Sequence, residues 1–448
     1  MTEPEKATER RSDRGGQDRV AASVVHPTGL DEFLPSAGIL SGMPTSINQP
    51  VILAAKRTPV GKFFGGLSKV PSPVLGSYAI KAAIEGLGGA AKVGSQIDEC
   101  IMGCVLQAGL GQNPARQAGL KAGLPDTLSA QTVNKVCGSG LQAVMLAAQS
   151  IKAGDSNLVV AGGFENMTAA PHFARVREGV KYGPTQMEDH MAFDGLRCAF
   201  EGCAMGNSAD YIADKYEISR GEQDRFAVQS HQRAAEATRQ GWFKAEMVGL
   251  TGEQCIDKRS PGVSADEGIR AETTLEAIAK LRPAFGTGGA GTVTAANASQ
   301  ISDGAAAVVV ANMATAERLG AKPIARILAY HTSGVAPKDI FAAPIEGVIG
   351  VLKKAGLSAQ DIDLFEINEA FAAQILSNLK GLKSAGHDIP ESRVNIGGGG
   401  VALGHPIGAS GARVLTTLIH QLHRTGGKRG LVALCLGGGN SVAMVVEV

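Results

Sequence analysis

A weak internal duplication constrains the fold of this chain more than any other feature of its sequence. The stretch VNKVCGSGLQAVMLAAQSIKAGDSNLVVAGGFE, which begins at Val133, is similar in outline to VNIGGGGVALGHPIGASGARVLTTLIHQLHRTGGKRGLVALCLGGG, which begins at Val394. Each copy starts with Val-Asn, turns at Ser-Gly, and continues through an apolar helix into a strand that enters a glycine cluster. Two such halves packed about a pseudo-twofold axis would bring two helix N-termini together, so we expect a site between them.

Length and composition indicate a large α/β protein. With 448 residues the chain exceeds one ordinary core, and strand-like and helical segments alternate along most of it. The 59 glycines and the aromatic content of only 4% predict tight turns and small side chains at close contacts. Because 43 basic residues balance 42 acidic ones, we expect no nucleic-acid partner. No apolar run approaches the ~18–20 residues that cross a bilayer, so we expect no membrane span.

The cysteines are expected to be free thiols. There are seven, an odd number, and the chain opens with charged residues rather than an apolar leader, which favours a reducing cytoplasm. Cys100 and Cys104 form a CxxxC pair, but no second pair or flanking histidine completes a zinc set. We therefore expect no metal, and we expect these two thiols to be buried.

The texture of the sequence changes along the chain. Residues 1–48 combine a charged stretch with a segment rich in Pro, Gly and Ser, which predicts a flexible extension. Acidic residues are interspersed among its arginines, whereas transit peptides are poor in acidic residues, so we favour a plain tail over a transit peptide. Strand and helix patterns alternate from Val51, give way between about 170 and 297 to charged helical segments with loops, and then resume. This predicts a subdomain inserted into the α/β core.

Cys137 is a candidate nucleophile. It lies in NKVCGSG at the start of an amphipathic helix whose apolar positions include Leu141 and Met145. The partial positive charge of a helix N-terminus favours a thiolate, and the small residues that follow allow a carbonyl group to approach backbone N–H donors. A lone cysteine at a crowded junction is more often a buried structural residue, so its context decides between the two interpretations.

His405 and Cys435 supply that context. His405 lies in the glycine-rich turn GGGGVALGHPIGASG, where Pro406 stiffens the chain and the glycines are expected to leave the ring accessible as a general base. Cys435 ends the apolar strand LVALCLGGG, and the N–H of Gly437 beyond it is a candidate donor to an oxyanion. The glycine cluster lacks the lysine and the following helix of a nucleotide-binding loop, so we reject that alternative.

Asn368 and Glu369 mark the end of a third strand. In FEINEAFAAQ they follow an apolar strand and are expected to open a helix at the carboxyl edge of a sheet, where α/β sites form. Capping of that helix by Asn368 is the structural interpretation, and it is compatible with a role in catalysis.

Five motifs in this order resemble the thiolase family, particularly its acetyl-CoA C-acetyltransferases, over about residues 50–448. They are NKVCGSG, NASQISDGAAA, NEAFA, GHPIGASGAR and CLGGGN. The resemblance implies two similar βαβαβαββ halves in a five-layered α-β-α-β-α core, with an inserted loop domain. It places the N-terminal half at residues 49–169 and 298–321, the loop domain at 170–297 and the C-terminal half at 322–448.

The resemblance also implies a role for each candidate. Cys137 is expected to take the acyl group, His405 to activate it, and Cys435 to act as acid and base at the α-carbon. Nε2–H of His405 and a water held by Asn368 would stabilise an enolate, while the N–H groups of Cys137 and Gly437 would form a second oxyanion hole. Coenzyme A thioesters are then substrates, and no cofactor is required.

Further positions are matched to binding of the pantetheine arm and the acyl group. The resemblance assigns this role to Ser299, Leu196, Met205, Phe285 and Phe371. Lys258 and Arg259 lie where the family has basic residues near the nucleotide phosphates, but we interpret them as solvated surface charges. Two segments depart from the family pattern, CAMG with Ala204 and IFAAP at 340–344, and both are expected to affect the acyl pocket.

The resulting hypothesis is a cytoplasmic acyltransferase, a homodimer or homotetramer, that condenses two acetyl-CoA to acetoacetyl-CoA and CoA or runs the reverse cleavage. A broader-chain 3-ketoacyl-CoA thiolase of fatty-acid breakdown is the second hypothesis. A thiolase-like protein that binds acyl-CoA without turnover is the third. A decarboxylating ketosynthase would need two histidines around its cysteine, and Cys435 argues against it.

Overall fold

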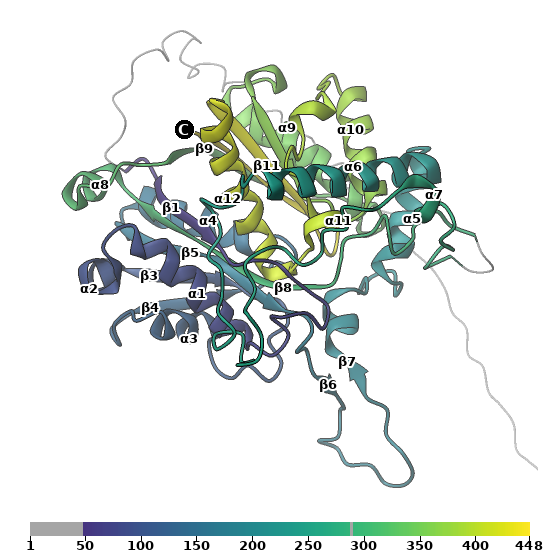
Figure 1. Cartoon of the computed structure of the whole chain (residues 1–448), viewed down its shortest axis with the longest axis horizontal. Helices are drawn as coiled ribbons and strands as arrows, with labels where there is room; N and C mark the ends of the chain where they lie inside the picture. Colours follow the sequence, from purple (N-terminus) through teal and green to yellow (C-terminus); the bar gives the residue numbers. More distant parts are fainter. Residues whose placement is uncertain (1–47, 287–289) are drawn as a thin grey trace, which may run out of the picture. The chain divides into compact units, whose positions relative to one another are not determined.

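The structure is a computed structural model that describes residues 48–286 and 290–448. The extension expected at residues 1–48 lies outside these residues, apart from its last position. Within the described chain, strands and helices alternate as the sequence predicts, and the strands form a ten-stranded mixed sheet and a two-stranded one (Figure 1).

The large sheet consists of two groups of strands that repeat the same spatial order. The first group, in that order, is β1 (Val51–Arg57), β8 (Ser302–Ala311), β5 (Leu158–Asn166), β3 (Glu99–Gly103) and β4 (Ser129–Val133). The second is β9 (Ala325–Gly334), β12 (Asn440–Glu447), β11 (Arg429–Leu436) and β10 (Leu364–Ile367).

The pairing directions repeat as well. In the first group β8 is antiparallel to β1 and β5, whereas β3 runs parallel to β5 and β4. In the second, β12 is antiparallel to β9 and β11, and β10 is parallel to β11. A single parallel bridge between Phe365 and Val394 stands where β4 stands in the first group. The two groups meet where β1 pairs with β9 over two residues.

Helices cover and separate the two groups of strands. Between them, α4 (Ser139–Ala153) contacts α12 (Ile407–Thr425); α4 packs mainly on β3 and β5, whereas α12 packs on β5 and β8 of the first group as well as on β10 and β11 of the second. Outside the first group lie α1 (Ser72–Glu85) and α3 (Pro114–Lys121); outside the second lie α9 (Ala343–Ala355) and α10 (Ala372–Ser384). The order of layers is therefore α-β-α-β-α, as expected from the sequence.

The central helices touch backbone to backbone because each carries a glycine at the crossing. A Cβ atom placed on Gly411 would lie 2.4 Å from the backbone nitrogen of Leu141, and one on Gly140 would lie 2.8 Å from that of Ala412. Such distances are far inside van der Waals contact, so only glycine fits without separating the helices. The Ser-Gly pairs of the duplication, expected from the sequence to be turns, lie near the N-termini of α4 and α12 and are the points where the halves dock.

The segment expected to be inserted has a different texture. It contains the short hairpin β6 (His172–Phe173) and β7 (Glu188–Asp189), the helices α5 (Met205–Lys215), α6 (Arg220–Arg239) and α7 (Leu275–Ile278), and long loops. The remaining short elements are β2 (Gly61–Lys62), α2 (Gly89–Val93), α8 (Met313–Leu319) and α11 (Gly400–Leu403).

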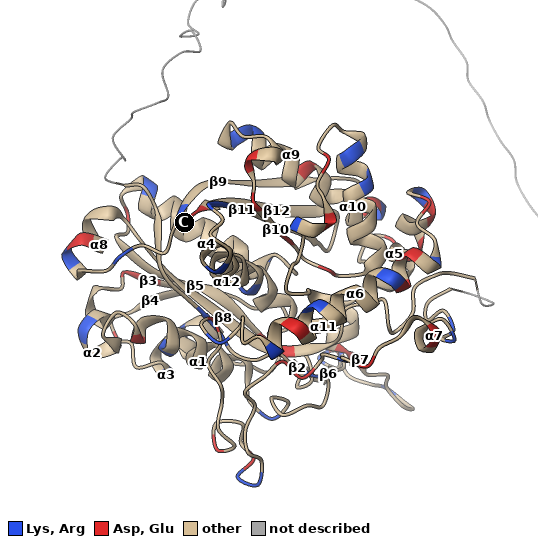
Figure 2. Ribbon diagram, turned by 45° about the horizontal axis from the view of Figure 1, so that its top comes forward, with Lys and Arg blue, Asp and Glu red and all other residues tan. Residues whose placement is uncertain are grey.

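Charged residues lie mainly on the outer elements. Figure 2 shows blue and red segments interspersed along α8, α9 and α10, while the central strands are almost entirely tan. Cys100 and Cys104 are fully buried, as expected. None of the helices in the described ranges combines the length and apolar character that a bilayer crossing needs.

Candidate active site

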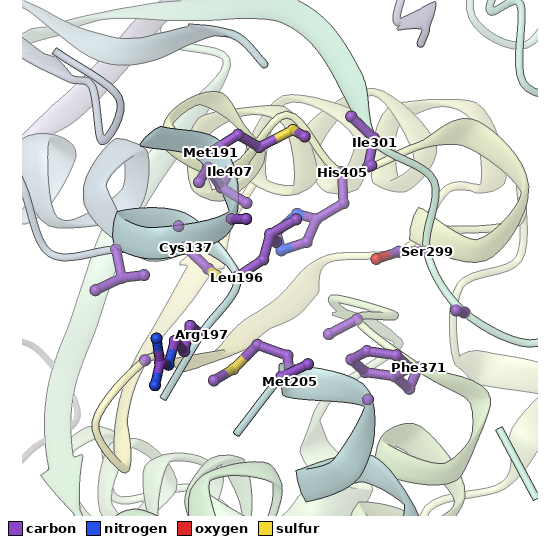
Figure 3. A pocket seen from close by; sticks show the side chains of 18 of the residues that line it. Cys137, Met191, Leu196, Arg197, Met205, Ser299, Ile301, Phe371, His405 and Ile407 are labelled. Carbon is purple, nitrogen blue, oxygen red and sulfur yellow. The ribbon is translucent and has the colours of Figure 1, made fainter. Parts of the chain in front are cut away.

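A cavity of about 1110 Å³ opens where the halves and the 170–297 segment meet. Figure 3 shows Cys137, His405 and Ser299 pointing into it, with Leu196, Met205 and Phe371 around them. Cys435 and Gly437 line the same cavity. The side chains that the sequence analysis selected from distant segments therefore share one space.

Cys137 lies in a tight turn between β4 and α4. Val136 adopts the left-handed conformation with φ of 47°, and the Ser139 hydroxyl closes the turn by accepting the N–H of Lys135 at 2.8 Å and donating to the carbonyl of Val136 at 2.6 Å. A Cβ atom on Gly138 would lie 2.3 Å from Leu436 Cδ2, so a glycine is needed where this turn meets β11.

The acidity of Cys137 differs from the sequence-based expectation. Burial raises the pKa of its thiol to about 12, while hydrogen bonds from its own N–H and that of Gly437 act in the opposite direction. This direction runs against the helix-stabilised thiolate expected from the sequence, because loss of water outweighs the local donors. Cys137 rests as a neutral thiol and needs a base.

His405 is suited to be that base: its side chain is largely buried, but the ring lines the cavity and is therefore accessible from it, as expected. Its Nδ1 lies 2.6 Å from the Ser410 hydroxyl, which donates its own hydrogen to the Pro406 carbonyl at 2.9 Å. Since that hydrogen is already used, Nδ1 must carry the ring proton and Nε2 must hold the lone pair. Burial, with a smaller contribution from Arg413, lowers the pKa of His405 to about 3, so the ring is neutral.

Cys435 is the second sulfur of the cavity. It is the last residue but one of β11, pairs with Ser441 of β12 and is 2% exposed. Burial raises the pKa of its thiol well above the ordinary value, and the nearby Cys137 raises it further. The two sulfurs thus interact electrostatically, and each resists becoming negative while the other is.

Asn368 and Glu369 occupy the loop between β10 and α10. Asn368 does not cap α10, because that helix begins only at Ala372 and Phe371 holds the cap position. Instead the buried Asn368 directs its Nδ2 toward Nε2 of His405 at 3.4 Å. Glu369 is also buried and accepts hydrogen bonds from Ser230 at 2.7 Å and Asn395 at 2.9 Å, which tie the loop to its surroundings.

The apolar residues assigned to substrate binding line the cavity together. Phe285, Phe371 and Phe341 form a chain of edge-to-face contacts, with ring centroids 6.5 and 5.2 Å apart. The cavity is also lined by Ser299, Leu196 and Met205. Of the two departures from the family pattern, Ala204, Ile340 and Phe341 reach its wall.

The sequence did not predict the cations that line the cavity, nor a buried carboxylate beside it. Lys258 and Arg259 are not among the residues that line the cavity; its cations are Lys62 of β2, Arg197 and Arg270, which come from three separate segments without a shared motif. Glu165, at the end of β5, is fully buried and accepts N–H groups from Val105, Leu106 and Gly408. The reasoning that selected Asn368, a polar side chain at a strand's carboxyl end, would also have selected Glu165.

A doubled, five-layered α/β core that brings two cysteines and a neutral histidine into one cavity defines a class of acyl-transferring enzymes. Residues 50–314 match the family described as "Thiolase, N-terminal domain", and residues 321–448 match "Thiolase, C-terminal domain". The chain belongs to the thiolase family.

Two relatives and one solved structure carry the name acetyl-CoA acetyltransferase. An acetyl-CoA acetyltransferase of Cupriavidus necator is 49% identical over 399 residues, which cover 89% of this chain and 98% of that protein. The cytosolic acetyl-CoA acetyltransferase of Mus musculus is 47% identical over 398 residues, covering 89% and 98%. The crystal structure of the Bacillus anthracis acetyl-CoA acetyltransferase superimposes with a TM-score of 0.84 at 38% identity, covering 90% of this chain and all of that one.

Proposed function

We propose that this enzyme catalyses the reversible Claisen condensation of two acetyl-CoA to acetoacetyl-CoA and CoA. The observation that carries the proposal is the convergence of Cys137, His405 and Cys435 on one cavity. The relatives named as acetyl-CoA acetyltransferases, at close to half identity over most of the chain, support the same reaction. Because these relatives are named as enzymes, they argue against the third hypothesis, in which the protein binds acyl-CoA without turnover.

The first step is acylation of Cys137. Its proton passes to Nε2 of His405, the only ring nitrogen with a free lone pair, and the sulfur attacks the thioester carbonyl. The carbon–sulfur bond to CoA breaks, and the departing sulfur takes a proton from Cys435. The result is an acetyl group on Cys137, an imidazolium at His405 and a thiolate at Cys435. Because one thioester replaces another, the free-energy change of this step is small and the step is reversible.

The second step forms the new carbon–carbon bond. The Cys435 thiolate takes a proton from the α-carbon of a second acetyl-CoA, and the resulting enolate attacks the acetyl group on Cys137. The tetrahedral intermediate collapses to acetoacetyl-CoA, and the Cys137 sulfur recovers its proton from His405. All three side chains return to their starting state.

Donors for the two oxyanions follow from the same geometry. Nε2–H of the protonated His405, next to Asn368 Nδ2, faces the enolate, together with a water that Asn368 would hold. The N–H groups of Cys137 and Gly437, which reach the Cys137 sulfur, would hold the oxygen of the tetrahedral intermediate. Because these donors are fixed before substrate binds, little reorganisation is needed when charge develops.

Binding and organisation complete the proposal. Acetyl-CoA, acetoacetyl-CoA and CoA would occupy the cavity along Ser299, Leu196, Met205, Phe285 and Phe371, with the three lining cations toward the phosphates. No metal or redox group takes part. Residues 49–169 with 298–321, 170–297 and 322–448 would act as N-terminal half, loop domain and C-terminal half. We further place the enzyme in the cytoplasm as a homodimer or homotetramer.

Cysteine substitutions test the mechanism. Cys137→Ser should abolish the acyl adduct that intact mass spectrometry detects after incubation with acetoacetyl-CoA, because the less acidic hydroxyl is a poor substitute for sulfur. Cys435→Ser should still form the acyl adduct with acetyl-CoA, although more slowly, because a thiolate can leave without being protonated; condensation should fall at least about 100-fold, since the base for the α-carbon is lost. An unchanged adduct in the first variant would remove Cys137 as the nucleophile.

A broader-chain thiolase is the second candidate, favoured by a single observation. Ile340 and Phe341, in the segment that departs from the family pattern, add buried apolar side chains to the cavity wall. Thiolysis rates measured for 3-oxoacyl-CoA substrates from C4 to C16 should nevertheless be highest at C4. A clear preference for long chains would reverse the order of the two candidates.

A further inference from the structure

The rim of the cavity carries two cysteines that the proposed reaction does not use. Cys198 and Cys203 lie in LRCAFEGCAMG, just before α5. Their neighbours in this segment line the cavity: Leu196, Arg197, Ala199, Phe200, Gly202 and Ala204. A chemical change at either sulfur would therefore act directly on the wall of the site.

The two cysteines are opposed across a tight turn. Arg197 and Ala204 form an antiparallel bridge, so Cys198 and Cys203 are the next pair inward, and the N–H of Cys198 donates to the carbonyl of Cys203 at 2.8 Å. Opposed residues of antiparallel strands project to the same face, with Cα atoms about 4.5–5.5 Å apart. Disulfides form at Cα separations of about 4.4–6.8 Å, so the backbone already allows one.

The surroundings of the two sulfurs differ. Cys203 is partly exposed, and its Sγ lies 3.8 Å from the hydroxyl of Ser208. Cys198 is 1% exposed, and its Sγ accepts the N–H of Glu201 at 3.4 Å, a donor that would also bind the sulfur anion. An oxidant in solvent therefore reaches Cys203 first, and the buried Cys198 is the neighbouring thiol that can react with the oxidised sulfur.

We propose that Cys198 and Cys203 form an oxidative modification site whose oxidant is a hydroperoxide. The Cys203 sulfur, having lost its proton, attacks the terminal oxygen, the O–O bond breaks, and a sulfenic acid and an alcohol (water, for hydrogen peroxide) form. Cys198 then attacks that sulfur; the S–S bond forms and the S–O bond breaks, releasing water. Two thiols and one hydroperoxide thus become one disulfide, one alcohol and one water.

Closing this bond would move part of the cavity wall. Cys203 would leave Ser208 and turn toward Cys198, carrying Ala204 and Met205, which lead into α5, with it. Neither residue donates or accepts a proton in the proposed reaction. Binding of the thioester should therefore weaken, while the chemistry at Cys137 proceeds at its usual rate.

Peptide mass spectrometry tests the site itself. The full chain is treated with hydrogen peroxide, alkylated without reduction and digested with trypsin, which releases Cys198 to Lys215 as one peptide with no other cysteine. We expect this peptide to be two hydrogens lighter and unalkylated, and to become alkylated twice after dithiothreitol. In Cys198→Ser, Cys203 should instead accumulate as a sulfenic acid that dimedone traps.

Other products would overturn the site. These are two alkylated cysteines after oxidation, a Cys203 that gains only sulfinic or sulfonic oxygens in the unsubstituted chain, or a disulfide from either residue to another cysteine. None of these readouts depends on turnover, so they stand apart from the proposed function.

A kinetic measurement tests the effect on the cavity and rests on the proposed function. Oxidised enzyme should show a KM for acetoacetyl-CoA in thiolysis about threefold or more above that of reduced enzyme, restored by dithiothreitol. KM is the suitable readout because oxidation of Cys137 or Cys435 would inactivate a fraction of the enzyme molecules. That loss lowers the maximal rate but leaves the KM of the remaining active molecules unchanged. The double variant Cys198→Ser, Cys203→Ser should show no shift. An unchanged KM in chains with the disulfide would refute the effect, whereas a reduced enzyme without turnover would refute the function alone.

Discussion

The hydroxyl of Ser410 determines which nitrogen of His405 faces the substrate. Ser410 lies one helical turn from Pro406 and donates a hydrogen bond to the Pro406 carbonyl. Because its only hydrogen is used there, the hydroxyl can only accept a hydrogen bond from Nδ1 of His405. The ring is thereby held with its lone pair on Nε2, toward Asn368 and the cavity. In the proposed mechanism, a residue with no contact to substrate thus sets the direction of proton transfer.

Replacing that hydroxyl should impair catalysis without unfolding the protein. Ser410→Ala removes the partner of Nδ1, worth about 1–2 kcal/mol, so kcat for thiolysis should fall about tenfold while KM changes little. The matched control is Ser384→Ala, whose hydroxyl bonds the carbonyl of Lys380 one turn back in the same way at 3.0 Å but lies on the surface. Equal kcat values for the two variants would contradict the orienting role of Ser410.

The sequence predicted the residues of the site better than their states. Cys137, His405 and Cys435 each stand in a local motif, so their identity was readable. Their protonation was not, because a pKa depends on how deeply the halves bury a group, and that depth arises only on docking. Burial thus opposes the thiolate expected at Cys137 and keeps the His405 ring neutral, although the ring lines the cavity as expected.

At the scale of elements, the crossing of α4 and α12 determines how closely the halves approach. The N-terminal turns of both helices carry the segments that present Cys137 and His405. Because Gly140 and Gly411 let the helices touch backbone to backbone, their N-termini, and with them the two reactive side chains, come within reach of one cavity.

A methyl group at the crossing should therefore be costly. In Gly411→Ala the new Cβ would lie 2.4 Å from the Leu141 backbone nitrogen, so the helices must separate, at about 2–4 kcal/mol. Chemical denaturation should report that loss. Gly86→Ala is the control, because no atom lies within 4 Å of its Cβ position and its φ of −63° suits alanine; similar losses in both variants would show that the crossing is not tight.

Long elements were predictable from periodicity, and junctions were not. The expected helix after Val-Asn at 133–134 and the strand before the glycines at 437–439 are present as α4 and β11. The helix expected to open at Asn368 starts four residues later, because Asn368 and Glu369 are held by His405, Ser230 and Asn395, contacts that no local pattern encodes.

For the whole molecule, buried carboxyl groups make stability depend on pH. Burial, partly offset by Arg413, raises the pKa of Glu366 to about 8, and burial raises that of Glu165 to about 7. The folded state thus binds protons that the unfolded state has released, so the free energy of unfolding falls as pH rises from about 4.5 toward 8. Buried histidines such as His405, whose pKa is lowered, act oppositely but only below about pH 6.5.

Between pH 6.5 and 8 the carboxyl groups act without that opposition. The free energy of unfolding should decline there, and Glu366→Gln, which resembles the protonated form, should remove about 1–2 kcal/mol of the decline. Denaturation midpoints at four or five pH values measure it, with the exposed Glu85→Gln as control. If the free energy of unfolding of Glu366→Gln declined with pH as steeply as that of the wild type, groups other than Glu366 would cause the pH dependence.

The division of the reactive groups between two halves also bears on synthesis by the ribosome. Cys137 emerges early, whereas His405 and Cys435 lie within the last 44 residues of the 448. A nascent chain with only its first half folded holds an ordinary thiol without a partner base. In the proposed mechanism, acyl transfer therefore waits until the segment that carries His405 and Cys435 has been made and has docked on the first half.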